Sequence, residues 1–181
     1  MIPAKEKKKQ SAAQYVLYMW QLEDLIRALN FDFQKIKKSF VDNTNNSEAE
    51  KEELTQWFQS LVDSMIADNV KATGHCQMVK NVVDELNDLH LQLLRSPVHI
   101  KYNTQFYSVL PLLAELRPKS NCGQEVNDIE LCLTAVYGVL LLGLQQKEVT
   151  EQTSKAVGQI MQFLEELSAL YKQDEEGILK L

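Results

Sequence analysis

A chain of 181 residues, 45% of them hydrophobic, has the length of one domain and enough apolar side chains for a full core. Six glycines and four prolines are few for this length, which disfavours a fold of many short strands joined by turns. The formal net charge of −6 disfavours nucleic acid as the main partner, because phosphate contacts draw on clustered lysine and arginine.

The apolar runs of the sequence are too short for an export signal or a membrane span. The run YVLYMW follows a lysine-rich N-terminus, but charged residues interrupt it and no small-residue cleavage site follows. The run over residues 131–144 falls short of the roughly 20 residues that cross a bilayer. The three cysteines, Cys76, Cys122 and Cys132, lack a CxxC pair and do not indicate a disulfide framework. We therefore expect a soluble, cytoplasmic protein with no membrane partner.

In chain order, the pattern first predicts a frayed N-terminus over residues 1–9 and a helix over about residues 10–29. The core face of this helix holds Tyr15, Tyr18, Met19, Leu22, Leu25, Ile26 and Leu29. A short helix over about residues 32–41 ends in the polar stretch DNTNNS. Ser47 and Glu50 then form a capping-box pattern, which predicts the start of a third helix.

The stretch KATGHC, residues 71–76, favours a break before a fourth helix that runs to Arg95, although one kinked helix remains an alternative. VHIKY alternates like a strand but has no partner strand, so it predicts an extended connector or a helix start. Three more helices are expected over about residues 104–116, 125–144 and 151–171. Pro111 should bend the first of these, and residues 172–181 should fray.

These elements predict an all-α fold, a single-domain bundle of six to seven helices over residues 1–181. The helix near residues 125–144 is apolar on nearly every side and is therefore expected at the centre. Glu130, Thr134 and Tyr137 share one side of it. This polar seam marks either the solvent edge of the bundle or a buried acid beneath a tyrosine. For a buried Glu130, Arg27 is the expected partner and His90 the second choice.

The first helix has a second, mixed surface. Glu23 and Arg27 are spaced i, i+4 with the acid first, which favours an ion pair. Leu17 and Trp20 lie beside them and would expose a large apolar area if this side faced water. We therefore expect this side to contact another helix, a second subunit or a ligand.

The stretch YVLYMWQLEDLIRA, together with Gly74-His75 and LHLQLL at residues 89–94, resembles an uncharacterised bacterial family of all-helical proteins of about this length. That family is classed as a domain of unknown function. The resemblance covers almost the whole chain and implies a helical fold, and it implies no activity.

No motif of the sequence indicates an enzyme class, a metal or a cofactor. Glu-x-x-His and His-x-x-x-His are absent, and His75 and His90 would lie about 22 Å apart on one straight helix. His90 lies within an apolar stripe, which predicts a hydrogen-bonded core histidine, whereas His75 beside a glycine is expected to cap a helix or face a cleft. Cys132 lies in the most apolar helix, where burial makes a thiol inert.

Two functions of different classes remain. The first is a non-catalytic helical bundle that acts by protein association, with self-association through Leu17 and Trp20 as the expected form. The second is a small-molecule-binding protein or enzyme with a polar cleft between the first, fourth and sixth helices. The candidate residues for that cleft are Glu23, Arg27, His75, His90, Glu130 and Tyr137.

Overall fold

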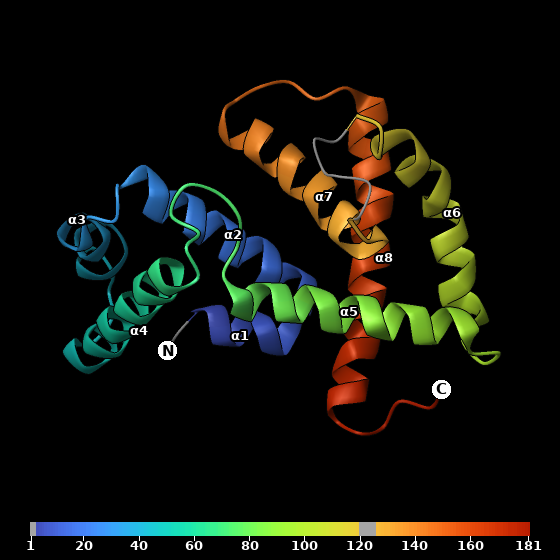
Figure 1. Cartoon of the computed structure of the whole chain (residues 1–181), viewed down its shortest axis with the longest axis horizontal. Coiled ribbons are helices and arrows are strands. Elements are labelled where there is room, and N and C mark those ends of the chain that lie inside the picture. Colours follow the sequence, from blue (N-terminus) through green and yellow to red (C-terminus); the bar gives the residue numbers. More distant parts are fainter. Residues whose placement is uncertain (1–2, 120–125) are drawn as a thin grey trace. The chain divides into compact units, whose positions relative to one another are not determined.

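The computed structural model describes residues 3–119 and 126–181, whose regular secondary structure is entirely helical (Figure 1). The all-α prediction is confirmed, with eight α-helices and one π-helix in these residues instead of six to seven helices. Cys122 lies outside the described residues. Contacts group the chain into two compact units. Unit 1 comprises the residues up to Gln10 with Gln14–Asn81, and unit 2 comprises Ser11–Ala13 with the residues from Val82 onward. The single-domain organisation of residues 1–181 therefore stays a prediction.

Unit 1 is built from the first five helices and the start of a sixth. These are α1 (Pro3–Gln10), α2 (Ala12–Ala28), α3 (Phe33–Lys37), the π-helix η1 (Lys38–Asp42), α4 (Glu48–Ala67) and the first turn of α5 (Gln77–Arg95). The N-terminus, expected to fray, is helical from Pro3, and Ala4 within it is buried. Lys7 Nζ lies 5.3 Å from the centre of the Tyr18 ring, a cation–π contact that holds α1 against α2.

The helix ends of unit 1 follow local rules that the sequence carries. The Ser47 hydroxyl accepts from the Glu50 N–H and the Glu50 carboxylate accepts from the Ser47 N–H, so the predicted capping box is confirmed. At the other end of α4, Asn69 takes a left-handed conformation with φ 57°. The Val70 N–H then donates to the Met65 carbonyl, which closes the helix in a Schellman motif. The break predicted between the third and fourth helices is thereby confirmed.

Unit 2 contains most of α5 together with α6 (Ile100–Leu116), α7 (Asp128–Leu144) and α8 (Glu151–Glu175). These last three helices pack against one another. Their shared core includes Tyr102, Leu113, Ile129, Leu131, Leu133 and Phe163. VHIKY is the start of α6, with His99 at the N-cap, and not a strand. Pro111 lies inside α6, and α8 continues four residues beyond the predicted end at Tyr171.

Helix α7, expected to be central, is buried over only part of its length. Its first half contributes Ile129, Leu131, Cys132, Leu133, Val136 and Tyr137 to the core. Residues 138–144 are half-buried or exposed, and Leu144 is 61% exposed. A helix that is apolar all round therefore places only its first half in the core of unit 2.

Candidate functional site

The carboxyl group of Glu23 is buried, with none of the residue exposed to solvent. Its Oε1 accepts from the Cys76 N–H at 2.9 Å, and its Oε2 lies 2.6 Å from His75 Nδ1. Cys76 directly precedes α5, so Glu23 lies at the positive end of that helix dipole, where a negative charge is favoured. The Asp68 carboxylate accepts from the next N–H, that of Gln77, at 2.7 Å. Two carboxylates thus cap the N-terminus of α5.

Arg27 binds the same connection from the following turn of α2. Its guanidinium donates to the Val70 carbonyl at 3.0 Å and to the Gly74 carbonyl, and it forms an ion pair with Asp24 at 2.7 Å. The predicted Glu23–Arg27 pair is wrong, because Glu23 bonds to His75 and Cys76 instead. Backbone groups of residues 70–76 need partners, and these two α2 side chains supply them.

Trp20 covers the face of His75. The two rings stack with centroids 4.3 Å apart and planes 14° apart, while the His75 side chain remains 29% exposed. Leu17 and Trp20, the residues predicted to form an interface, are 6% and 4% exposed. Their burial leaves little of either side chain for contact with a second copy. We call the group formed by Trp20, Glu23, Arg27, His75 and Cys76 the α2 clasp.

The α2 clasp offers no activated nucleophile. Burial, followed by the charge of Glu23, raises the pKa of the Cys76 thiol to about 12, so the thiol stays protonated at neutral pH. The Glu23 carboxylate is already engaged by two donors. The geometry therefore indicates that the α2 clasp anchors the chain between α4 and α5.

His90 is the second buried polar residue among the candidates, and it lies in unit 2. Its Nδ1 is 2.7 Å from the Tyr102 hydroxyl, and the rings of Tyr102, Phe106 and Phe163 surround it at centroid distances of 5.9, 4.6 and 5.8 Å. Burial lowers the pKa of His90 from 6.5 to about 4, which keeps the ring neutral at physiological pH. The prediction of a hydrogen-bonded core histidine is confirmed.

Glu130 and Tyr137 belong to unit 2, whereas the α2 clasp belongs to unit 1. Glu130 is half-buried in the first turn of α7, where its N–H donates to Asn127 Oδ1 at 2.8 Å, and Tyr137 is buried further along that helix. The predicted Glu130–His90 pair is wrong, because His90 bonds to Tyr102. The Glu130–Arg27 pair would join the two units and stays a prediction, while Arg27 bonds to Asp24 and the loop carbonyls within unit 1. The six candidates therefore divide between the two units: Glu23, Arg27 and His75 meet in unit 1, and the other three lie in unit 2.

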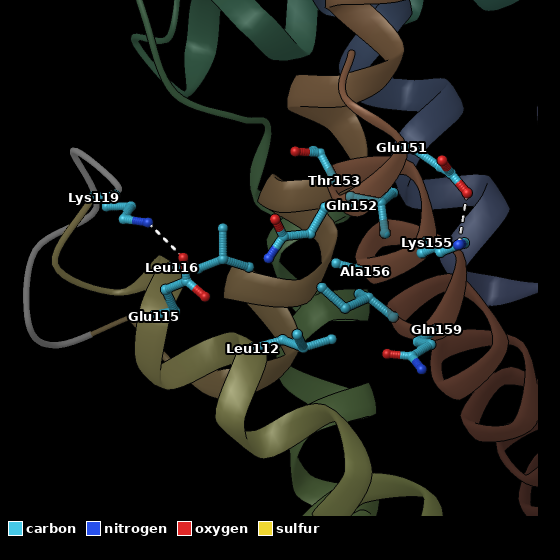
Figure 2. Close-up of a pocket in the computed structure, with 12 residues that line it drawn as sticks. Leu112, Glu115, Leu116, Lys119, Glu151, Gln152, Thr153, Lys155, Ala156 and Gln159 are labelled. Carbon is cyan, nitrogen blue, oxygen red and sulfur yellow. Dashed lines mark hydrogen bonds and ion pairs between the residues drawn. The ribbon is translucent and has the colours of Figure 1, made fainter.

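The described residues of unit 2 form grooves of about 720, 570 and 420 Å³. The groove of about 720 Å³ lies between α6 and the N-terminal part of α8 (Figure 2). Its apolar lining consists of Leu112, Leu116, Ala156, Val157 and Ile160. An ion pair lies on each rim, Glu115–Lys119 at 2.7 Å and Glu151–Lys155 at 2.6 Å. The groove of about 420 Å³ is lined by His90 together with residues of α5 and α6.

Two hydrogen-bonding groups of these contacts could not be predicted from the sequence. The Cys76 N–H belongs to the backbone, so the residue type does not indicate that it binds Glu23. Tyr102 follows a proline-containing connection, so helical spacing does not predict that its hydroxyl meets His90. Within residues 3–119 and 126–181, no group of three or more His, Cys, Asp or Glu side chains is placed to hold a metal ion. Every helix in those same residues is too short or too polar to cross a bilayer.

A family model of a domain of unknown function, DUF4924, matches residues 1–178, and the chain belongs to this family. Comparison with curated proteins and comparison with solved structures both give no match.

The clasp geometry sets an expected order of stability effects. Glu23→Ala leaves the Cys76 N–H and the His75 ring without their buried acceptor, which should lower the free energy of unfolding by about 3 to 5 kcal/mol. Glu130→Ala removes a half-buried side chain and should cost less than about 1 kcal/mol. Urea denaturation followed by circular dichroism measures both variants. Equal losses would contradict an anchoring role for Glu23.

The lowered pKa of His90 predicts a specific acid sensitivity. As the pH falls from 6.5 towards 4, the unfolded chain binds a proton at His90 that the folded chain does not, so stability falls in this window and is intact above it. At pH 4.5 the loss is about 2 to 3 kcal/mol. His90→Gln, which cannot take up this proton, should lose that much less than the parent protein between pH 7.0 and 4.5. Identical pH dependences of the two urea midpoints would refute the assignment.

Proposed function

We propose that this member of the family is a non-catalytic association module that binds a second copy of its own chain through the C-terminal half of α7. The observation that supports the proposal is the exposed apolar surface at the end of this helix, where Leu140 is 36% and Leu144 is 61% exposed. Residues 131–146 contain no charged side chain. Removing apolar area of this kind from water by contact with another surface is favourable in free energy.

Charge favours a second copy as the occupant. With a net charge of −6, two copies repel each other over most of their surfaces, and the repulsion is weakest where both contribute an uncharged stretch. A leucine surface is also self-complementary across a two-fold axis, because each side chain meets the same kind of side chain. It carries no charge that would select a different protein.

We propose the cytoplasm as the location of the protein. Cys76 and Cys132 are buried free thiols in the structure, which fits a reducing compartment. The association model does not depend on catalysis at either thiol, since burial raises the pKa of both.

Sedimentation velocity over a concentration series tests the association. We expect a reversible dimer, and the double variant Leu140→Glu/Leu144→Glu should weaken it at least tenfold because dimerisation would bury four carboxylates. Ile178→Glu provides a matched control, since Ile178 is 62% exposed and lies outside the helices. Circular dichroism verifies that each variant is folded.

A further variant distinguishes the α7 surface from the groove in Figure 2. Val157 lines that groove on α8, so Val157→Glu should leave the dimer unchanged. A protein that remains monomeric at all concentrations, or a dimer weakened by Val157→Glu and not by the α7 double variant, would overturn the proposal.

A further inference from the structure

The groove of unit 2 that His90 lines has an apolar wall and a buried polar floor. Leu91 and Leu94 of α5 face Phe106 and Leu110 of α6 across it, and Leu91 and Leu110 are 42% and 41% exposed. Its volume of about 420 Å³ lies at the small end of the roughly 300–1,000 Å³ typical of ligand pockets. The groove is thus of a size for a small molecule.

His90 supplies the floor of the groove and is only 1% exposed. Its Nδ1 bonds to the Tyr102 hydroxyl, and the ring lines the groove. Because Nδ1 is engaged, Nε2 is the ring nitrogen left for a hydrogen bond with a molecule in the groove. The groove gives a ligand access to this ring.

The contact with Tyr102 determines which ring nitrogen of His90 carries the proton. A phenol O–H is a stronger donor than a neutral imidazole N–H, and an imidazole nitrogen is a stronger acceptor than a phenol oxygen. Burial also raises the pKa of Tyr102, so the phenol keeps its proton. The Tyr102 O–H therefore donates to Nδ1, and the ring proton lies on Nε2. The floor of the groove offers a hydrogen-bond donor.

The polar end of the groove lies where α7 begins. Asn127 caps this helix, and Arg117 donates to the Val126 carbonyl and to Asp128 at 2.6 and 2.5 Å. The positive end of a 17-residue helix dipole and a guanidinium thus face one carboxylate, that of Asp128. The two positive groups outnumber the one carboxylate, so this end of the groove favours an added anion over an added cation.

We propose that the groove over His90 binds a small monocarboxylate with an apolar body of about ten carbons, whose carboxylate accepts from His90 Nε2–H and whose hydrocarbon lies against Leu91, Leu94 and Leu110. This site does not depend on the α7 surface proposed for dimerisation, because neither Leu140 nor Leu144 lines the groove. The two proposals can fail separately.

Isothermal titration with decanoate tests the site, with decanol and decylammonium as probes that share the body but not the carboxylate. Decanoate should bind at least tenfold more tightly than either, and its binding should shift the ¹⁵N resonance of His90 Nε2 in NMR spectra. No binding of decanoate, or equal binding of decanol, would overturn the proposal.

Three variants locate the binding. His90→Phe keeps a ring in the core and removes the Nε2–H, and Leu110→Glu places a like charge on the exposed wall; each should weaken decanoate binding at least tenfold. Tyr107→Glu is the matched control, because Tyr107 lies on the same helix, is 64% exposed and does not line the groove.

Leu110→Glu keeps the test decisive if His90→Phe does not fold, because Leu110 is partly exposed. Decanoate binding that survives Leu110→Glu, or that Tyr107→Glu weakens equally, would refute this location. The Leu140→Glu/Leu144→Glu variant should bind decanoate like the parent protein, and this separates a failed ligand site from failed dimerisation.

Discussion

The buried carboxylate of Glu23 fixes the course of the chain between α4 and α5. An isolated anion in a protein interior is strongly unfavourable, so its burial requires donors. The Cys76 N–H and His75 supply them, and both belong to the connection that the carboxylate holds. The interaction also provides an acceptor at the N-terminus of α5, where the first N–H groups have no partner within the helix. One side chain of α2 therefore satisfies a helix end and a loop together.

Arg27 binds the same connection as a donor, whereas Glu23 binds it as an acceptor. Its N–H groups satisfy the carbonyls of Val70 and Gly74, while Glu23 satisfies an N–H and a ring nitrogen. The connection between α4 and α5 runs without regular structure, so the carbonyls of Val70 and Gly74 need partners from outside it. Because both side chains bond to this connection, Glu23 and Arg27 lie one turn apart on α2 without pairing with each other.

Local and periodic features could be predicted from the sequence, and long-range pairings could not. The capping box at Ser47, the break after Ala67 and the core position of His90 depend on neighbours within one or two turns. The partner of Glu23 lies 52 residues away, and the choice between Arg27 and His75 depends on where the loop returns. Helical spacing favours Arg27 because it measures only distance along one helix. Tertiary contact outweighs that preference here.

The same limit applies to α7, whose composition predicts burial along its whole length. Composition measures how apolar a helix is and carries no information on how many neighbours are present to cover it. In unit 2, the first half of α7 is buried and the second half leaves Leu140 and Leu144 exposed. An entirely apolar helix can therefore serve as core at one end and as a contact surface at the other.

The His90–Tyr102 pair has an energetic cost that a structural role alone does not require. A leucine at 90 and a phenylalanine at 102 would fill similar space with no polar group to desolvate, and replacing both partners of a buried hydrogen bond with apolar groups is often nearly neutral. The pair engages Nδ1 and the phenol, so Nε2 is the ring nitrogen left for a ligand. An acceptor that enters the groove would bind that nitrogen and offset the cost of burying the ring. A buried histidine beneath an apolar wall distinguishes this groove from the one of about 720 Å³ between α6 and α8, whose charged rim side chains pair with each other.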